Sequence, residues 1–201
     1  NGAETDDFLL ASKQQEIQAK LDQYPSIEVV HLSIGGNDVL GDWNVSFTQA
    51  QTDSLENAVF QRLDSAITFI KTTRPGIQIL WSGYTYPNFG EVIASASPFQ
   101  TNHPFYGTWE DMGFPTFQQL NEVQNQFSNL ILNHYSSDPQ VKFIPATGLM
   151  QYTFGQNSPL GVAPGGTYPA FTVSLPEGNP VYPSPKNSMR NYGLTRDCFH
   201  L

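Results

Sequence analysis

Charged residues are scarce in this chain. Only 13% of its 201 residues are charged, and nine Lys or Arg stand against 18 Asp or Glu, which gives a formal net charge of −9. Soluble proteins usually carry about twice that share of charge. A negative field without any Lys/Arg cluster argues against binding to nucleic acid or to an anionic membrane surface. Binding of a neutral ester or a glycan is compatible with this negative charge.

Cysteine and long apolar runs are also nearly absent. The single cysteine, Cys198, cannot form an internal disulfide and leaves the redox compartment open. No apolar stretch approaches the roughly 18 residues that a membrane span needs, and no signal-peptide pattern is visible. The low charge, scarce lysine and many aromatic and proline residues favour a secreted or periplasmic protein.

Three helix–strand units can be read along the chain. Apolar residues recur at helical intervals over residues 5–24, 52–73 and 116–135. Short apolar segments follow at 27–34, 77–81 and 141–144. This alternation predicts one α/β domain over residues 1–201, with a parallel sheet covered on both faces.

A functional site is expected beyond the carboxyl ends of these strands, where ligands bind in open α/β sheets. Each strand there leads into a polar loop that contains glycine. Two further stretches, 87–115 and 148–192, are rich in proline, glycine and aromatic residues. We expect ordered insertions, with 148–192 as a loop-rich segment near the site.

Two motifs occur in a fixed order. Gly35-Gly36-Asn37-Asp38 follows the first strand, and Asp197-Cys198-Phe199-His200 lies near the end of the sequence. Together they resemble the third and fifth conserved blocks of the SGNH (GDSL-like) ester hydrolases, and Gly2 matches the end of the second block. The resemblance implies a three-layer α/β/α, flavodoxin-like fold, truncated at both ends, with lipase-like esterase activity.

The resemblance also assigns roles to residues. It makes His200 the general base and Asp197 the acid that orients its imidazole. It makes the Asn37 amide and the Gly2 N–H oxyanion-hole donors. Gly35 and Gly36 support the motif, and Asp38 fixes the loop through hydrogen bonds. Two tyrosines on a strand-end loop, Tyr84 and Tyr86, are candidates for lining the substrate pocket.

The first block of the family, which carries the nucleophilic serine, is missing. Asp53-Ser54-Leu55 imitates it but begins a helix without a preceding strand, and Thr52 or Asp53 suits a helix cap there. Ser65, after Asp64, lies inside the same helix. We therefore expect the serine outside this chain, in N- or C-terminal portions of the same protein or in a separate chain, and we expect this polypeptide alone to be inactive.

Simpler interpretations compete with these assignments. Gly35–Asp38 alone is as typical of a tight turn, and His31 suits a hydrogen-bonded core histidine. The four histidines lack metal-ligand spacing with carboxylates or Cys198, so neither a metal nor another cofactor is expected. One hypothesis is a serine esterase acting on acetylated carbohydrates, short-chain esters or lipids. The other is a non-catalytic domain of the same fold that binds a glycan or a protein. A nucleotide-binding flavodoxin-like domain would need a Gly-rich phosphate loop, which the chain lacks.

Overall fold

The computed structural model describes residues 3–87, 89, 93 and 98–147 of the chain. These residues fall into two compact units. The first contains residues 3–43, Phe47–Gly83 and Leu130–Ile144, and the second contains Asn44–Ser46, Tyr84–Asn129 and residues 145–147. The segment 148–192, predicted to be an insertion near the site, lies outside the described residues.

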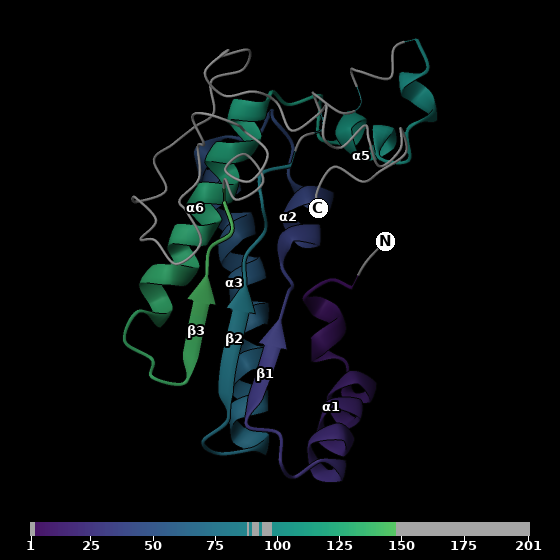
Figure 1. The fold of residues 1–201 in the computed structure, drawn as a ribbon. Helices are drawn as coiled ribbons and strands as arrows, with labels where there is room; N and C mark the ends of the chain where they lie inside the picture. Colours follow the sequence, from purple (N-terminus) through teal and green to yellow (C-terminus); the bar gives the residue numbers. More distant parts are fainter. Residues whose placement is uncertain (1–2, 88, 90–92, 94–97, 148–201) are drawn as a thin grey trace, which may run out of the picture. The chain divides into compact units, whose positions relative to one another are not determined.

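A three-stranded parallel sheet forms the centre of the first unit. β1 (Val29–Leu32), β2 (Gln78–Ser82) and β3 (Val141–Ile144) are adjacent in that order. Trp81 of β2 lies opposite Leu32 on one side and Phe143 on the other. Figure 1 shows the three strands side by side and pointing the same way. The predicted strands, their parallel pairing and the α/β class are confirmed.

One face of this sheet is buried, and the other face is largely exposed. Trp81 is 1% exposed on the buried face, whereas Val29 and Ile144 on the opposite face are 54% and 43% exposed. The prediction that both faces are covered is therefore not met within the described residues. Burial alternates along β1 and β3, so only every second residue of these strands faces the core.

The longest helix, α3 (Gln49–Thr73), lies behind the strands in Figure 1. It begins with a capping box in which Thr48 accepts from the Gln51 N–H while the Gln51 side chain accepts from the Thr48 N–H. The predicted start at Thr52 or Asp53 is wrong, because Thr52 is buried within the helix and accepts a hydrogen bond from Trp43. Residues at helical spacing along α3 are almost fully buried: Val59, Leu63, Ile67 and Ile70.

The predicted helix over 5–24 is in fact two segments. A short 3-10 turn, η1 (Asp6–Leu9), is separated from α1 (Ala11–Gln23) by Leu10, whose backbone is extended. After α1 the chain turns towards β1, and the guanidinium of Arg74 lies over this turn. It donates hydrogen bonds to four backbone carbonyls, those of Leu21, Tyr24, Pro25 and Ile27. Arg74 therefore joins the end of α1 to the segment that precedes β2.

The end of α6 (Phe117–Tyr135) packs between α3 and the sheet. The Tyr135 ring centroid is 6.2 Å from that of Trp81 on β2 and 6.0 Å from that of Phe60 on α3. The Tyr135 hydroxyl donates to Asp64 over 2.6 Å. Burial, and then this hydrogen bond, raise the pKa of Tyr135. These contacts place the core of the first unit between the sheet and α3.

The second unit contains η2 (Gln100–Asn102) and α5 (Tyr106–Asp111). After α5, the Gly113 N–H donates to the Glu110 carbonyl over 2.8 Å and the Phe114 N–H donates to the Trp109 carbonyl over 2.9 Å. This pattern is a Schellman cap, and the perpendicular contact between the Phe114 and Trp109 rings, 5.1 Å apart, accompanies it. Within 87–115 the described residues thus include two short helices.

Candidate functional site

The Gly-Gly-Asn-Asp motif lies at the carboxyl end of β1, where the sequence predicted a site. Gly35 has a φ of +104°, in the left-handed region, and it is the N-cap of α2 (Gly36–Asp42). The motif was predicted to be a loop, but Gly36, Asn37 and Asp38 form the first turn of this helix. Gly35 thus turns the chain sharply from β1 into α2. This turn sets the direction in which the Asn37 and Asp38 side chains point.

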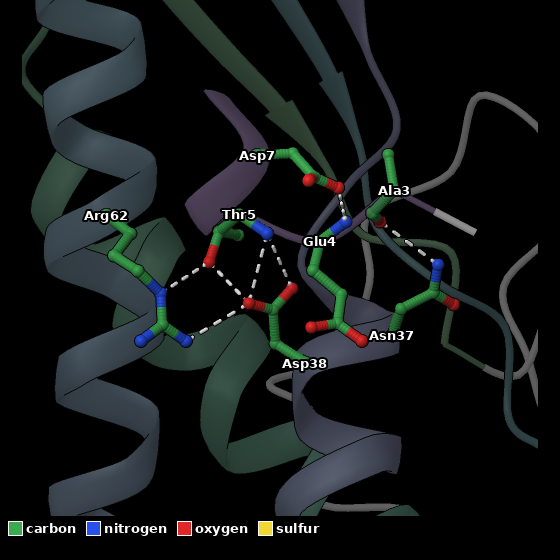
Figure 2. A network of polar contacts seen from close by, with 7 residues as sticks. All are labelled: Ala3, Glu4, Thr5, Asp7, Asn37, Asp38 and Arg62. Carbon is green, nitrogen blue, oxygen red and sulfur yellow. Dashed lines mark hydrogen bonds and ion pairs between the residues drawn. The ribbon is translucent and has the colours of Figure 1, made fainter. Parts of the chain in front are cut away.

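The side chain of Asn37 reaches back to the beginning of the chain. Its Nδ2 donates a hydrogen bond to the carbonyl oxygen of Ala3 over 3.1 Å (Figure 2). This bond assigns the amide orientation, because the oxygen of Asn37 cannot donate to a carbonyl. One of the two amide N–H groups is used in this contact. Asn37 is partly exposed, and its side chain makes no other hydrogen bond within the described residues.

Asp38 is the centre of a buried polar cluster. Its side chain is 1% exposed, and both of its carboxylate oxygens accept from the Thr5 N–H over 3.1 Å. The Thr5 hydroxyl also donates to Asp38. Asp38 was predicted to fix its own loop through backbone hydrogen bonds; it does accept from a backbone N–H, but from that of Thr5 and not from its own turn.

Arg62 of α3 completes this cluster. Its Nη2 donates to Asp38 over 3.1 Å, and its Nε donates to the Thr5 hydroxyl over 2.7 Å (Figure 2). A buried carboxylate is stable in its charged form only when it is paired and hydrogen-bonded. We call Thr5, Asp38 and Arg62 the Asp38 clasp. It connects three separate segments of the first unit around the motif.

The field around this clasp is negative. Burial, followed by the nearby charge of Asp38 and then by Asp6, Asp42 and Asp7, raises the pKa of Glu4. The Glu4 N–H also donates to Asp7 over 3.0 Å. Arg62 compensates Asp38 but not these other carboxylates. An anionic ligand is therefore disfavoured at this end of the sheet.

Three predicted site residues lie outside the described residues. They are Gly2, Asp197 and His200. The convergence of Asn37 and His200 on one point therefore stays a prediction. The contact of Asn37 with Ala3 does bring Asn37 next to the residue that directly follows Gly2.

The two tyrosines proposed for a substrate pocket belong to the second unit. Tyr86 is only 3% exposed, and its hydroxyl donates to Asn125 over 3.1 Å. This burial favours a structural role for Tyr86. Tyr84 is partly exposed.

The structure corrects the interpretation of His31 and locates the serines that were rejected as nucleophiles. His31 is exposed and not in the core, because it belongs to the open face of β1, and its Nε2 lies 2.7 Å from the Ser82 hydroxyl. Ser54 and Ser65 are both exposed on α3, and Ser65 donates to the Gln61 carbonyl. Neither follows a strand.

A buried polar stripe on α6 was not found from the sequence. Asn121 is fully buried, and neither of its amide atoms has a hydrogen-bond partner in the part of the chain that the structure describes. Further buried polar residues share its side of the helix: Gln124, Asn125 and Ser128. Their spacing of three, four and seven residues is itself a helical signal, which is missed when only apolar positions are counted.

The described residues contain no group of three or more His, Cys, Asp or Glu side chains that could hold a metal ion. Among them, no helix is long and apolar enough to cross a membrane. Neither a scan of the chain against protein-family models nor a search among curated proteins finds a match.

Proposed function

We propose that this chain is the larger part of an SGNH-type serine ester hydrolase whose nucleophilic serine lies outside the 201 residues. The observation that carries the proposal is the 3.1 Å hydrogen bond between the Asn37 amide and the Ala3 carbonyl. In the family that the motifs resemble, the second-block glycine and the third-block asparagine act on the same oxyanion. These two segments must then be neighbours, as Asn37 and Ala3 are.

The proposed reaction uses residues from both motifs. His200 takes the proton of the serine hydroxyl as that oxygen attacks the ester carbonyl, and Asp197 stabilises the imidazolium that forms. The negative oxygen of the tetrahedral intermediate accepts hydrogen bonds from the free N–H of Asn37 and from the Gly2 N–H. His200 then returns the proton to the leaving alcohol. Water, activated by the same imidazole, releases the acid from the acyl-enzyme.

The missing strand, which would precede the nucleophilic serine, can lie beside β1 at the edge of the described sheet. β1 pairs with β2 on one side, and its other side has no strand partner among the described residues. A further parallel strand on that side would end beside the turn at Gly35, because parallel strands finish at the same edge. A serine following such a strand would lie next to Asn37. The three-layer, flavodoxin-like fold is part of this proposal.

The charge of the site favours an uncharged ester. The net charge of −9 and the carboxylates around Glu4 disfavour substrates that are themselves acidic. Acetylated carbohydrates and short-chain esters meet this condition. The low share of charged residues and the scarcity of lysine support secretion or a periplasmic location.

Labelling with a fluorophosphonate tests the proposal in the complete translation product, with the labelled peptide identified by mass spectrometry. We expect the label on a serine outside residues 1–201. It should be lost in His200→Ala and slowed in Asn37→Ala by about 100- to 1,000-fold, the usual cost of one oxyanion donor.

Ser82→Ala is the matched control, because the Ser82 hydroxyl already has a histidine partner in His31. We expect this variant to label as the wild type does. No labelling of the wild type would contradict the hydrolase and favour a non-catalytic domain that binds a glycan or a protein. A label mapped to Ser82 would contradict the proposed site.

A further inference from the structure

Two parallel connections join the N-terminal segment to the first turn of α2. The Ala3 carbonyl accepts from Asn37, and the backbone and hydroxyl of Thr5 donate to Asp38 (Figure 2). Ala3 and Thr5 are two residues apart, and Asn37 and Asp38 are consecutive. The position of the Ala3 carbonyl relative to the Asn37 amide therefore depends on how firmly Thr5 is held by Asp38.

Arg62 controls that second connection. It contacts both partners at once, Thr5 through Nε over 2.7 Å and Asp38 through Nη2 over 3.1 Å. The Thr5 hydroxyl lies between two charged groups, accepting from Arg62 and donating to Asp38. Arg62 also places its positive charge against the Asp38 side chain, which is only 1% exposed.

A rigid element carries Arg62 to this position. α3 has 25 residues. On its inner side, close to Arg62 in the sequence, Val59 is 0% exposed and Leu63 is 1% exposed. The guanidinium is a planar fork that holds two acceptors in fixed directions, whereas an ammonium acts as a point charge. Arg62 thus fixes the N-terminal segment against α2 with defined geometry.

From these contacts we infer that Arg62 is a positioning residue for the proposed oxyanion site. Acting through Asp38 and Thr5, it fixes the Ala3 carbonyl that orients the Asn37 amide, so that the remaining N–H of Asn37 points in one direction. This inference rests on the proposed function. It assigns no contact between Arg62 and the substrate.

Steady-state hydrolysis of 4-nitrophenyl acetate by the complete translation product tests the inference. Arg62→Met keeps the apolar stem and removes the fork. We expect kcat to fall about 10- to 100-fold, less than or equal to the loss of one oxyanion donor, with KM changed by less than about twofold. Arg62→Lys should retain an intermediate kcat, because an ammonium restores the charge but not both hydrogen bonds.

Lys71→Met is the matched control, since it removes another ion pair of α3, the 2.6 Å contact with Asp138. We expect it to lower stability without lowering kcat. If Arg62→Met folds and keeps the wild-type kcat, or if Lys71→Met loses as much activity, the inference is wrong. If Arg62→Met does not fold, Thr5→Val replaces it, because valine removes only the hydroxyl bridge, and it should give the same fall in kcat.

A second measurement needs no activity. In the 201-residue chain, the side-chain amide of Asn37 can be followed by NMR, with Asn37→Ala to identify its signals. We expect slow hydrogen exchange in the wild type and in Lys71→Met, and faster exchange in Arg62→Met or Thr5→Val. Unchanged exchange would overturn the inference while leaving the hydrolase proposal intact. Absence of hydrolysis and labelling in the wild type would instead overturn the proposed function.

Discussion

Replacing Arg74 by methionine tests how much one side chain contributes to holding the first unit together. The Arg74 guanidinium donates to the carbonyls of Tyr24, Pro25 and Ile27 over 3.2 Å each, and to that of Leu21. Methionine keeps most of the apolar stem and removes all four hydrogen bonds. The last carbonyls of a helix have no partner within the helix, and Leu21 lies in the last turn of α1, so Arg74 satisfies one group that α1 leaves open.

The expected loss can be worked from these contacts. A hydrogen bond to a charged group contributes about 1.5–3 kcal/mol when water cannot replace it. Two of the contacts, those with Leu21 and Ile27, are partly buried, and the other two are exposed to water. Since hydrogen bonds from one group are not additive, we expect Arg74→Met to lower the free energy of unfolding by about 2–4 kcal/mol.

Urea unfolding followed by circular dichroism measures this change, and the slope with urea should stay the same. Arg74→Lys should lose an intermediate amount, because an ammonium cannot reach all of these carbonyls. Lys13→Met is the control, as its ion pair with Glu16 is exposed and should contribute less than about 1 kcal/mol. A loss below about 0.5 kcal/mol in Arg74→Met would refute the reasoning.

Three further predictions concern backbone strain and charge. Gly113→Ala should lower the melting temperature of the second unit, because the φ of Gly113 is +79° and the added Cβ would lie 2.8 Å from a Val45 methyl carbon. Gly107→Ala should not lower it, because nothing lies within 4 Å of the added Cβ. Calorimetry that shows the reverse order would contradict both expectations. Glu4→Gln should raise stability at pH 7. Burial, and then the neighbouring acids, raise the pKa of Glu4, so the wild type loses stability as the pH rises through that pKa. Equal melting temperatures of the two proteins at pH 7 would refute this. The hydrogen bond from Lys71 lowers the pKa of Asp138. The wild type should therefore be more stable than Lys71→Met at pH 7, and this difference in stability should shrink as the pH falls below about 4. A difference in melting temperature that stays constant with pH would contradict the prediction.

Periodicity and turn signals in the sequence predicted much of the first unit. The spacing of Leu55, Val59, Leu63, Ile67 and Ile70 predicted the inner side of α3, on which Leu55 is half-buried and the other four are almost fully buried. Apolar segments predicted all three strands. Element ends were less predictable, because they depend on which residue forms the cap. The start of α3 at Thr48 follows from its reciprocal bonds with Gln51, which the apolar pattern does not contain.

The candidate site was predictable only in part. The motif indicated that Asn37 and Asp38 lie at the end of β1, and the structure places them there. Arg62 could not be found in this way, because its partners Asp38 and Thr5 are 24 and 57 residues away and a single arginine on a helix resembles any solvated cation. His31 was misjudged because an apolar strand sequence does not tell which side of a sheet is open.

The sequence separation within the Asp38 clasp also bears on the order of folding. Thr5 and Asp38 are 33 residues apart, and Thr5 and Arg62 are 57 residues apart. Closing such loops costs chain entropy that only the finished contacts offset. We therefore expect the segment around Thr5 to dock after α2 and α3 have formed, and to open first in the native ensemble. The last step of assembly would then be the one that sets the direction of the Asn37 amide.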